Sequence, residues 1–126
     1  MISGIILASG FSRRMEKDKL LMEIEGMPLV ERVIKACVDS NLDEVILIYR
    51  QKAVLDIGKK YKIKAIYNEN AILGQSESLK LGVREAKGAK AYMFFVGDQP
   101  FIKAELVNML IDEYIKSQAA ILVPFY

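Results

Sequence analysis

The sequence contains no histidine among its 126 residues, and this absence removes several kinds of catalytic site. Serine and cysteine nucleophiles commonly depend on a histidine base, so the chain holds no Ser-His or Cys-His pair. Cys37 is the only cysteine, which excludes an internal disulfide and a structural zinc site. One cysteine suits a reducing compartment, and we expect a cytoplasmic protein. Any working metal would be a hard ion held by oxygen ligands, Mg²⁺ first and Mn²⁺ as the alternative.

Other features are also missing. The net charge of +2 is too small for a surface that coats a polyanion, so we expect no nucleic acid as partner. No apolar run approaches the roughly 20 residues of a membrane span, and no secretory signal pattern opens the chain. We therefore expect no membrane partner. The Walker pattern and the dinucleotide fingerprint are absent, which excludes an ordinary P-loop and an ordinary nicotinamide site. With 52% apolar and 27% charged residues, one globular domain is expected.

The most informative stretch that is present opens the chain. The apolar run from Ile5 to Ala8 is typical of a strand that is buried on both faces of a parallel sheet. The small residues Ser9 and Gly10 follow, and then a group of cations. Small residues let backbone N–H groups approach anionic oxygens, and Arg and Lys side chains add charge-assisted hydrogen bonds. We expect a polyphosphate cradle with Arg14 and Lys19 as phosphate ligands; a solvated basic loop is the alternative.

Beyond this stretch, predicted strands alternate with predicted helices. Short apolar or alternating runs predict further strands over residues 44–49, 62–67, 91–96 and 120–123. Helical spacing of apolar residues predicts helices over residues 28–40, 51–60, 77–87 and 103–116. This alternation indicates an α/β fold with a parallel sheet. We expect the strand over 62–67 at an edge of the sheet and the strand over 91–96, the most apolar, near its centre.

In parallel α/β sheets, ligands bind outside the carboxyl ends of the strands. Three chemically rich segments follow predicted strands, over residues 9–19, 68–78 and 97–98. They would bring cations, amide and hydroxyl groups, and one carboxylate to a single crevice. Asp98 can also be interpreted as a turn residue, because Gly-Asp-x-Pro is favourable turn chemistry. We favour a Mg²⁺ ligand over a turn residue, since Asp98 follows the most apolar strand and would face the basic loop.

Three motifs, taken in order, resemble those of the MobA-like nucleotidyltransferases, the guanylyl- and cytidylyltransferases of the molybdenum cofactor. LASGFSRRM at residues 7–15, followed by KLL at 19–21, is similar to their opening signature. GDQPF at residues 97–101 is similar to their metal-binding segment. GQSESLKLG at residues 74–82 is more similar to the cytidylyl branch. The guanylyl branch typically has Gly-Pro-Leu-Ala-Gly there, and a second glycine at the place of Ser9.

The resemblance implies a Rossmann-like three-layer domain over residues 1–126, with the strand order 3-2-1-4-5. It implies transfer of CMP, or in the alternative GMP, from a nucleoside triphosphate to the terminal phosphate of molybdopterin, with release of pyrophosphate. CTP and molybdopterin would be the substrates, and a molybdoenzyme or its chaperone a further partner. A sugar- or alditol-phosphate nucleotidyltransferase and a non-catalytic nucleotide-binding remnant stay open. Family members continue past this length, so we expect the C-terminal part of the family fold to be missing.

The resemblance also assigns roles by position. Arg14 and Lys19 would hold the triphosphate and stabilise charge on the α-phosphorus, and Asp98 would ligate the metal. These three form the expected catalytic set. The implied nucleotide-binding residues are Leu7, Ala8, Ser9, Gly10, Arg14, Lys19, Asn68, Gln75 and Ser78. Nucleotidyl transfer needs positioning and charge neutralisation more than a protein nucleophile, so the absence of histidine agrees with this chemistry.

Overall fold

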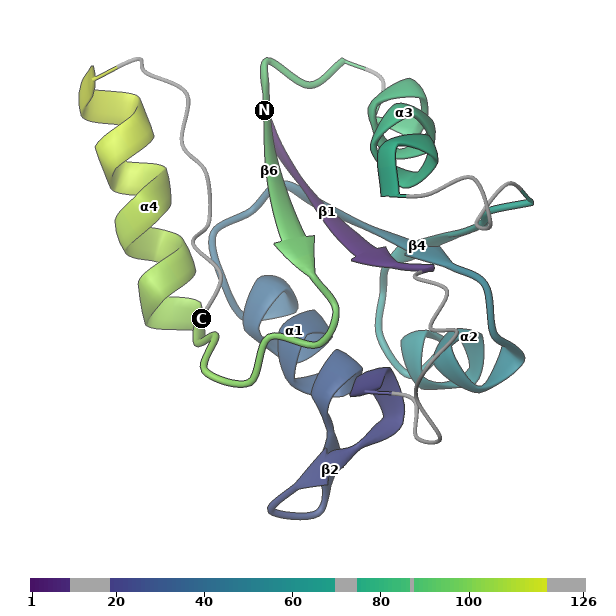
Figure 1. Ribbon diagram of the computed structural model, residues 1–126. Helices are drawn as coiled ribbons and strands as arrows, with labels where there is room; N and C mark the ends of the chain where they lie inside the picture. Colours follow the sequence, from purple (N-terminus) through teal and green to yellow (C-terminus); the bar gives the residue numbers. More distant parts are fainter. Residues whose placement is uncertain (10–18, 70–74, 87, 118–126) are drawn as a thin grey trace.

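The computed structural model describes residues 1–9, 19–69, 75–86 and 88–117 (Figure 1). Its main sheet contains the parallel strands β1 (Ile2–Ala8), β4 (Glu44–Tyr49), β5 (Lys64–Tyr67) and β6 (Ala91–Val96). The helices are α1 (Leu29–Val38), α2 (Lys52–Gly58), α3 (Gln75–Glu85) and α4 (Ala104–Ser117). A 3-10 turn, η1 (Lys19–Leu21), precedes a small antiparallel hairpin of β2 (Glu23–Ile24) and β3 (Met27–Pro28). The fold is therefore α/β with a parallel main sheet, as the alternation of elements predicts.

The strand order of the main sheet is β5-β4-β1-β6, which is 3-2-1-4 in the chain order of the predicted strands. β5 lies at an edge, as expected. β6 was expected near the centre, but it forms the other edge of the described sheet, where β1 is its partner. Its burial alternates accordingly: Met93 and Phe95 are buried, whereas Tyr92 is exposed. The predicted strand over 120–123 lies outside the described residues.

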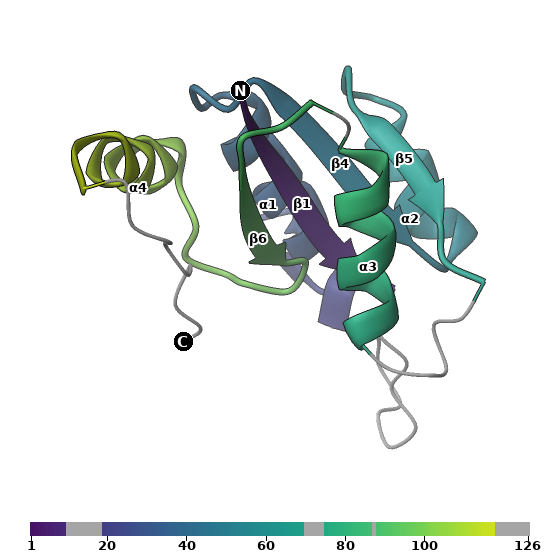
Figure 2. The same cartoon turned by 90° about the horizontal axis from the view of Figure 1, so that it is seen from above.

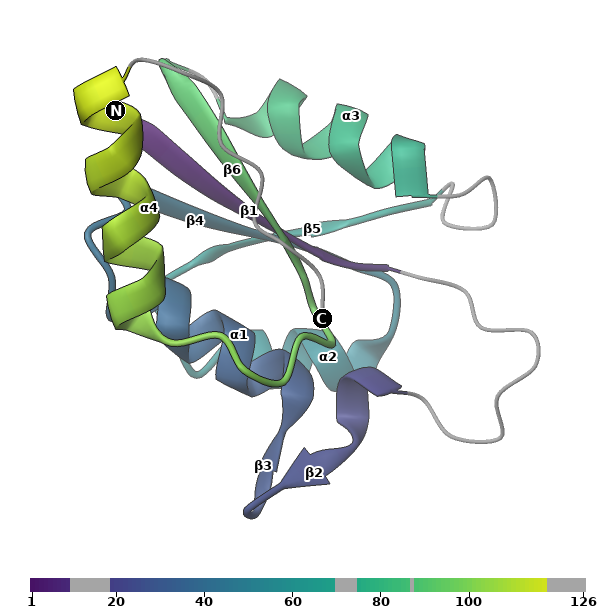
Figure 3. The same cartoon turned by 60° about the vertical axis from the view of Figure 1, so that its left-hand side comes forward.

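Helices cover both faces of the sheet (Figures 2 and 3): α1 and α2 lie on one face, and α3 lies on the other across β1. Successive side chains of a strand point to opposite faces, so β1 supplies both layers of the core. Ile6 and Ala8 pack on the side of α1 and α2, and Ile5 and Leu7 pack on the side of α3. All four are buried, which confirms a central strand buried on both faces.

Helix α3 packs directly on β1 because Gly82 has no side chain. A Cβ at this position would lie 2.5 Å from Cγ2 of Ile5, so only glycine allows this approach without a shift. The helix begins at Gln75, two residues before the predicted start at residue 77, which places Ser76 inside the first turn. Gly88 follows the helix with a φ of +83°, a left-handed conformation that suits a glycine after a helix end.

The remaining helices follow their predicted ranges with local corrections. Pro28 is the N-cap residue of α1, one position before the first helical turn where it was placed. Cys37 of this helix is fully buried, and burial raises the pKa of its thiol, as suits a core residue. In α4, Val107 and Ile111 hold buried positions, whereas Met109 is 57% exposed. Within the described residues, no helix has the length and apolar character that crossing a bilayer requires.

Candidate functional site

The carboxyl end of β1 is the centre of the candidate site. The side chains of Leu7, Ala8 and Ser9 are all at least nine-tenths buried, so only their backbone could face a ligand. Leu7 C=O already accepts a hydrogen bond from the backbone N–H of Gly97, at 3.0 Å. That bond extends the parallel pairing of β1 and β6 by one residue past the end of β6 and holds the carboxyl ends of the two strands side by side. The predicted contacts Gly10 and Arg14 lie outside the described residues.

Lys19 and Asp98 lie on neighbouring parts of this edge because the residues next to them touch. A Cβ on Gly97 would come within 2.7 Å of Cδ2 of Leu20, so the Leu20 side chain rests on the Gly97 backbone. Lys19 precedes Leu20 and is exposed, and Asp98 follows Gly97 and is half-buried. Within the described residues, neither charge belongs to an ion pair. One cation and one carboxylate are thus accessible at the edge where the sequence placed them.

The surroundings of Asp98 decide which kind of metal site it could form. Asp98 lies in a turn in which the N–H of Gln99 donates to the C=O of Val96 at 3.3 Å, so the turn interpretation is correct for the backbone. Its carboxylate remains partly exposed. Among the described residues, no three carboxylate or cysteine side chains converge on one point. A lone carboxylate suits Mg²⁺ or Mn²⁺ that is held mainly by phosphate oxygens and water, and does not suit an ion caged by protein alone.

A buried polar cluster lies immediately behind the end of β1. It consists of Ser9, Asn68 and Ser78, which we call the hydroxyl cluster. The Ser9 and Ser78 hydroxyl groups are hydrogen-bonded to each other. Asn68 Nδ2 lies 3.0 Å from Ser9 Oγ and 3.0 Å from Ser78 Oγ and donates to both. The structure thus brings together three of the predicted nucleotide contacts, but points their side chains at one another. Gln75, a fourth predicted contact, begins α3 in the same region.

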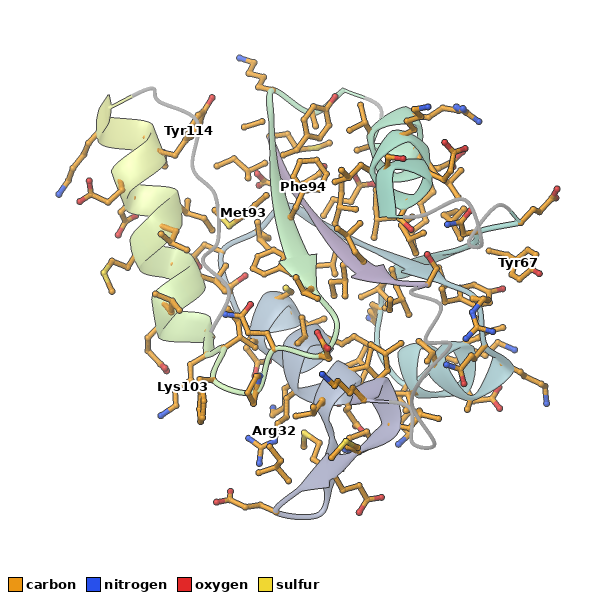
Figure 4. The ribbon with its side chains drawn as sticks, in the orientation of Figure 1. Arg32, Tyr67, Met93, Phe94, Lys103 and Tyr114 are labelled. Atoms are coloured by element: carbon orange, nitrogen blue, oxygen red, sulfur yellow. The ribbon has the colours of Figure 1, made fainter. Side chains whose placement is uncertain are left out.

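Two hollows on the surface were not anticipated from the sequence. The smaller, of about 240 Å³, lies between α3 and the end of β5, where Tyr67, Asn68, Lys80 and Arg84 are among its lining residues. The spacing of Lys80 and Arg84, four residues apart on a helix, was the available sequence signal for it. Tyr67 is 52% exposed at this edge, and its ring meets the Tyr49 ring with centroids 5.8 Å apart (Figure 4).

The larger hollow, of about 400 Å³, lies among the β2–β3 hairpin, α1 and the start of α4. Arg32 and Lys103 lie on its walls, with Glu25 and Asp39 among the acidic groups nearby (Figure 4). Arg32 is already engaged: it donates to the C=O of Ile24 at 2.7 Å and pairs with Glu25 at 3.4 Å. Among the predicted nucleotide-site residues that the structure describes, none lines this hollow, so it is separate from the described part of the candidate site.

Comparison with known families matches residues 4–126 to the MobA-like NTP transferase domain. The chain belongs to this family. It is 30% identical over 125 residues to a probable molybdenum cofactor guanylyltransferase of Natranaerobius thermophilus, which covers 98% of this chain and 60% of that protein. It is 31% identical over 119 residues to the purine catabolism protein PucB of Bacillus subtilis, across 86% of this chain and 58% of that protein. The chain therefore spans somewhat less than two thirds of these relatives.

Solved structures agree with the MobA-like assignment. A nucleotidyl transferase from Methanothermobacter superposes with a TM-score of 0.80 at 26% identity, over 89% of this chain and 57% of that one. A CMP:2-keto-3-deoxy-manno-octonic acid synthetase complexed with CTP superposes with a TM-score of 0.77 at 23% identity, over 94% of this chain and 48% of that one. At that identity the second likeness shows the fold alone. Together they confirm the Rossmann-like nucleotidyltransferase fold that the sequence motifs predicted.

Proposed function

We propose that this chain carries the nucleotide-binding half of a metal-dependent nucleotidyltransferase, which transfers CMP from CTP to the terminal phosphate of molybdopterin. The observation that carries the proposal is the contact between Leu20 and Gly97 at the carboxyl edge. The exposed residue Lys19 directly precedes Leu20, and the half-buried residue Asp98 directly follows Gly97, which supports a site that offers one cation and one carboxylate. A triphosphate with a bound cation carries the complementary charges, and family membership makes a nucleoside triphosphate the expected ligand.

In the proposed reaction, a terminal phosphate oxygen of the acceptor attacks the α-phosphorus of the nucleotide. The bond from the α-phosphorus to the oxygen bridging it to the β-phosphorus breaks, and pyrophosphate leaves with that electron pair. Lys19, together with Arg14, would offset the negative charge that builds up on the phosphate oxygens. The attacking group is already an anion, so no base has to remove a proton. This explains how a chain without histidine can serve the reaction.

Asp98 would hold a divalent cation together with phosphate oxygens and water. When bound, Mg²⁺ would supply charge neutralisation at the triphosphate, and Mn²⁺ is the alternative. A solved relative of the same fold was determined in complex with manganese, and at 19% identity its likeness to this chain concerns the fold alone. The half-buried position of Asp98 supports the role, because its backbone belongs to a hydrogen-bonded turn while the residue is still partly exposed.

Two nucleotides have separate support. CTP is favoured by the segment over residues 74–82, which resembles the cytidylyl branch. GTP is favoured by the names of relatives such as the probable molybdenum cofactor guanylyltransferases of Natranaerobius thermophilus and Methanosarcina acetivorans. We retain CTP as the first candidate, because the segment belongs to this chain. A sugar- or alditol-phosphate acceptor and a non-catalytic binding module are the further alternatives, and the cytoplasmic location and the molybdoenzyme partner stay predictions.

Calorimetric titration with CTP, GTP, ATP and UTP in the presence of Mg²⁺ tests the proposal directly. We expect CTP to bind most tightly and the Asp98→Ala variant to bind CTP with Mg²⁺ at least tenfold more weakly, since a charge-assisted interaction contributes about 1.5–3 kcal/mol. Asp112→Ala, on the exposed face of α4, is the matched control and should bind like the parent. Equal affinity of the Asp98→Ala variant for CTP with Mg²⁺ would remove Asp98 from the metal site.

A second measurement separates the enzyme from a binding module. Pyrophosphate release is followed after molybdopterin is added to the protein with CTP and Mg²⁺. Release that depends on both substrates supports the transferase, and tight nucleotide binding with no release supports a non-catalytic module. Pyrophosphate release with a sugar phosphate in place of molybdopterin would show that the proposed acceptor is wrong and that the proposed reaction class, nucleotidyl transfer, is correct.

A further inference from the structure

The hydroxyl cluster joins three parts of the chain that are distant in sequence. Ser9 follows β1, Asn68 follows β5, and Ser78 lies in the first turns of α3. Ser9 is separated from Asn68 by 59 positions and from Ser78 by 69. All three side chains are at most 3% exposed. A hydrogen-bonded group of this kind fixes the relative positions of the elements that contribute to it, because each buried partner would otherwise be left unsatisfied.

The residues on both sides of Ser9 in this cluster are anchored to the sheet. The backbone N–H of Asn68 donates to the C=O of Tyr49 at 2.9 Å, which anchors Asn68 to the end of β4. Ser78 is carried by α3, which rests directly on Ile5 through the bare backbone of Gly82. The residue held between them is Ser9, the first residue of the segment that the sequence predicts to form a phosphate cradle. The cluster therefore restrains the point at which that segment leaves the sheet.

We infer that Ser9, Asn68 and Ser78 are positioning residues, which fix the point at which the predicted phosphate-binding segment leaves β1 and do not read the nucleobase. This inference rests on the proposed function. Each serine hydroxyl has two partners inside the cluster, which accounts for most of its hydrogen-bonding capacity. A ligand that contacts the chain at this fixed point removes less conformational entropy when it binds. This smaller entropy loss applies to any ligand that uses the point, whatever its base.

This role makes a prediction that a base contact would not make. Ser78→Ala and Ser9→Ala should each weaken binding of CTP, GTP and inorganic tripolyphosphate, with Mg²⁺ present, by about the same factor. We expect about tenfold, because removal of one partner leaves a buried donor or acceptor unsatisfied. The Ser9→Ala and Ser78→Ala double variant should lose little more than either single variant, because both single changes break the same Ser9–Ser78 bond.

Ser3→Ala is the matched control. Ser3 is also a fully buried serine on β1, and its hydroxyl donates to Glu44 Oε1 at 2.8 Å, but it lies at the amino end of the strand. We expect Ser3→Ala to lower the melting temperature, as the cluster variants do, and to leave all three dissociation constants unchanged. If Ser3→Ala weakened binding as much as Ser78→Ala, the effect would reflect general destabilisation, and the positioning role would be wrong.

Three further results would overturn the inference. A change in the ratio of CTP to GTP affinity, with tripolyphosphate unaffected, would make the serines base contacts. Fully additive losses in the double variant would show that they act independently. Unchanged affinity of the Ser78→Ala variant for all three ligands would show that the cluster stabilises the fold but has no role in ligand binding. A parent protein that binds tripolyphosphate but no nucleotide would instead refute the proposed function, and the tripolyphosphate series would still test the cluster.

Discussion

Gly97 is the position at which a single methyl group should disturb both the fold and the candidate site. A Cβ there would lie 2.7 Å from Cδ2 of Leu20, 3.1 Å from Cβ of Ala8 and 3.3 Å from the carbonyl oxygen of Leu7. The Leu20 side chain could rotate away, but it is itself buried in the core, and the Leu7 oxygen belongs to the central strand. Gly97→Ala therefore forces either an unfavourable rotamer or a backbone shift.

Overpacking of a filled core costs roughly 1–3 kcal/mol. Unfolding entropy near 60 °C is about 2.1 cal/mol/K per residue, or about 0.26 kcal/mol/K for a chain of this length. The expected fall in melting temperature for Gly97→Ala is therefore roughly 4–11 °C, measured by circular dichroism. Because Leu20 carries Lys19 with it, the affinity for CTP with Mg²⁺ should fall as well. Calorimetric titration of the variant below its melting temperature measures this second effect.

Gly58→Ala separates the two effects. A Cβ at Gly58 would meet Cδ2 of Leu47 at the same distance of 2.7 Å, but Gly58 ends α2 and lies away from the carboxyl ends of the strands. We expect Gly58→Ala to lower the melting temperature and to leave the nucleotide affinity unchanged. A Gly97→Ala variant with the parent's melting temperature and affinity would refute the packing argument. A Gly97→Ala variant with the parent's affinity but a lowered melting temperature would show that Leu20 moves without displacing Lys19.

Two further predictions concern groups outside the site. The Tyr61 hydroxyl donates a hydrogen bond to Glu31 Oε2 at 2.6 Å. Burial, with the neighbouring Glu31, raises the pKa of Tyr61 to about 12 from an ordinary value near 10. The contribution of Tyr61 to folding stability is therefore fully present below pH 10 and is lost between pH 10 and 12. Tyr61→Phe should lower stability by about 1–2 kcal/mol in urea unfolding at pH 7, with a smaller difference from the parent at pH 11.5; a pH-independent difference would contradict the pairing with Glu31. Cys37 should react with a thiol-specific disulfide reagent only after denaturation, since burial raises its pKa, and fast reaction in the folded protein would show that α1 opens.

The sequence alone determined the succession of strands and helices, and it predicted the edge of the sheet at which the candidate site lies. These follow from local information: the apolar run before Ser9, the helical spacing in α1, and the short strand that ends just before Gly97. The same information excluded histidine-based catalysis. It did not determine which face of α4 is covered, because Met109 and Val107 are both apolar and packing against the neighbouring α1 decides which of the two is buried.

Tertiary structure decided which partners the predicted site residues contact. Ser9, Asn68 and Ser78 were each compatible with a nucleotide contact when judged from position in the chain. Their mutual hydrogen bonds became visible only when β1, β5 and α3 were brought together across 59 and 69 residues. The role of Gly97 likewise depends on where Leu20 packs. Periodicity reports which face of an element is buried, but the partner of a buried polar group is set by long-range packing, which no local pattern encodes.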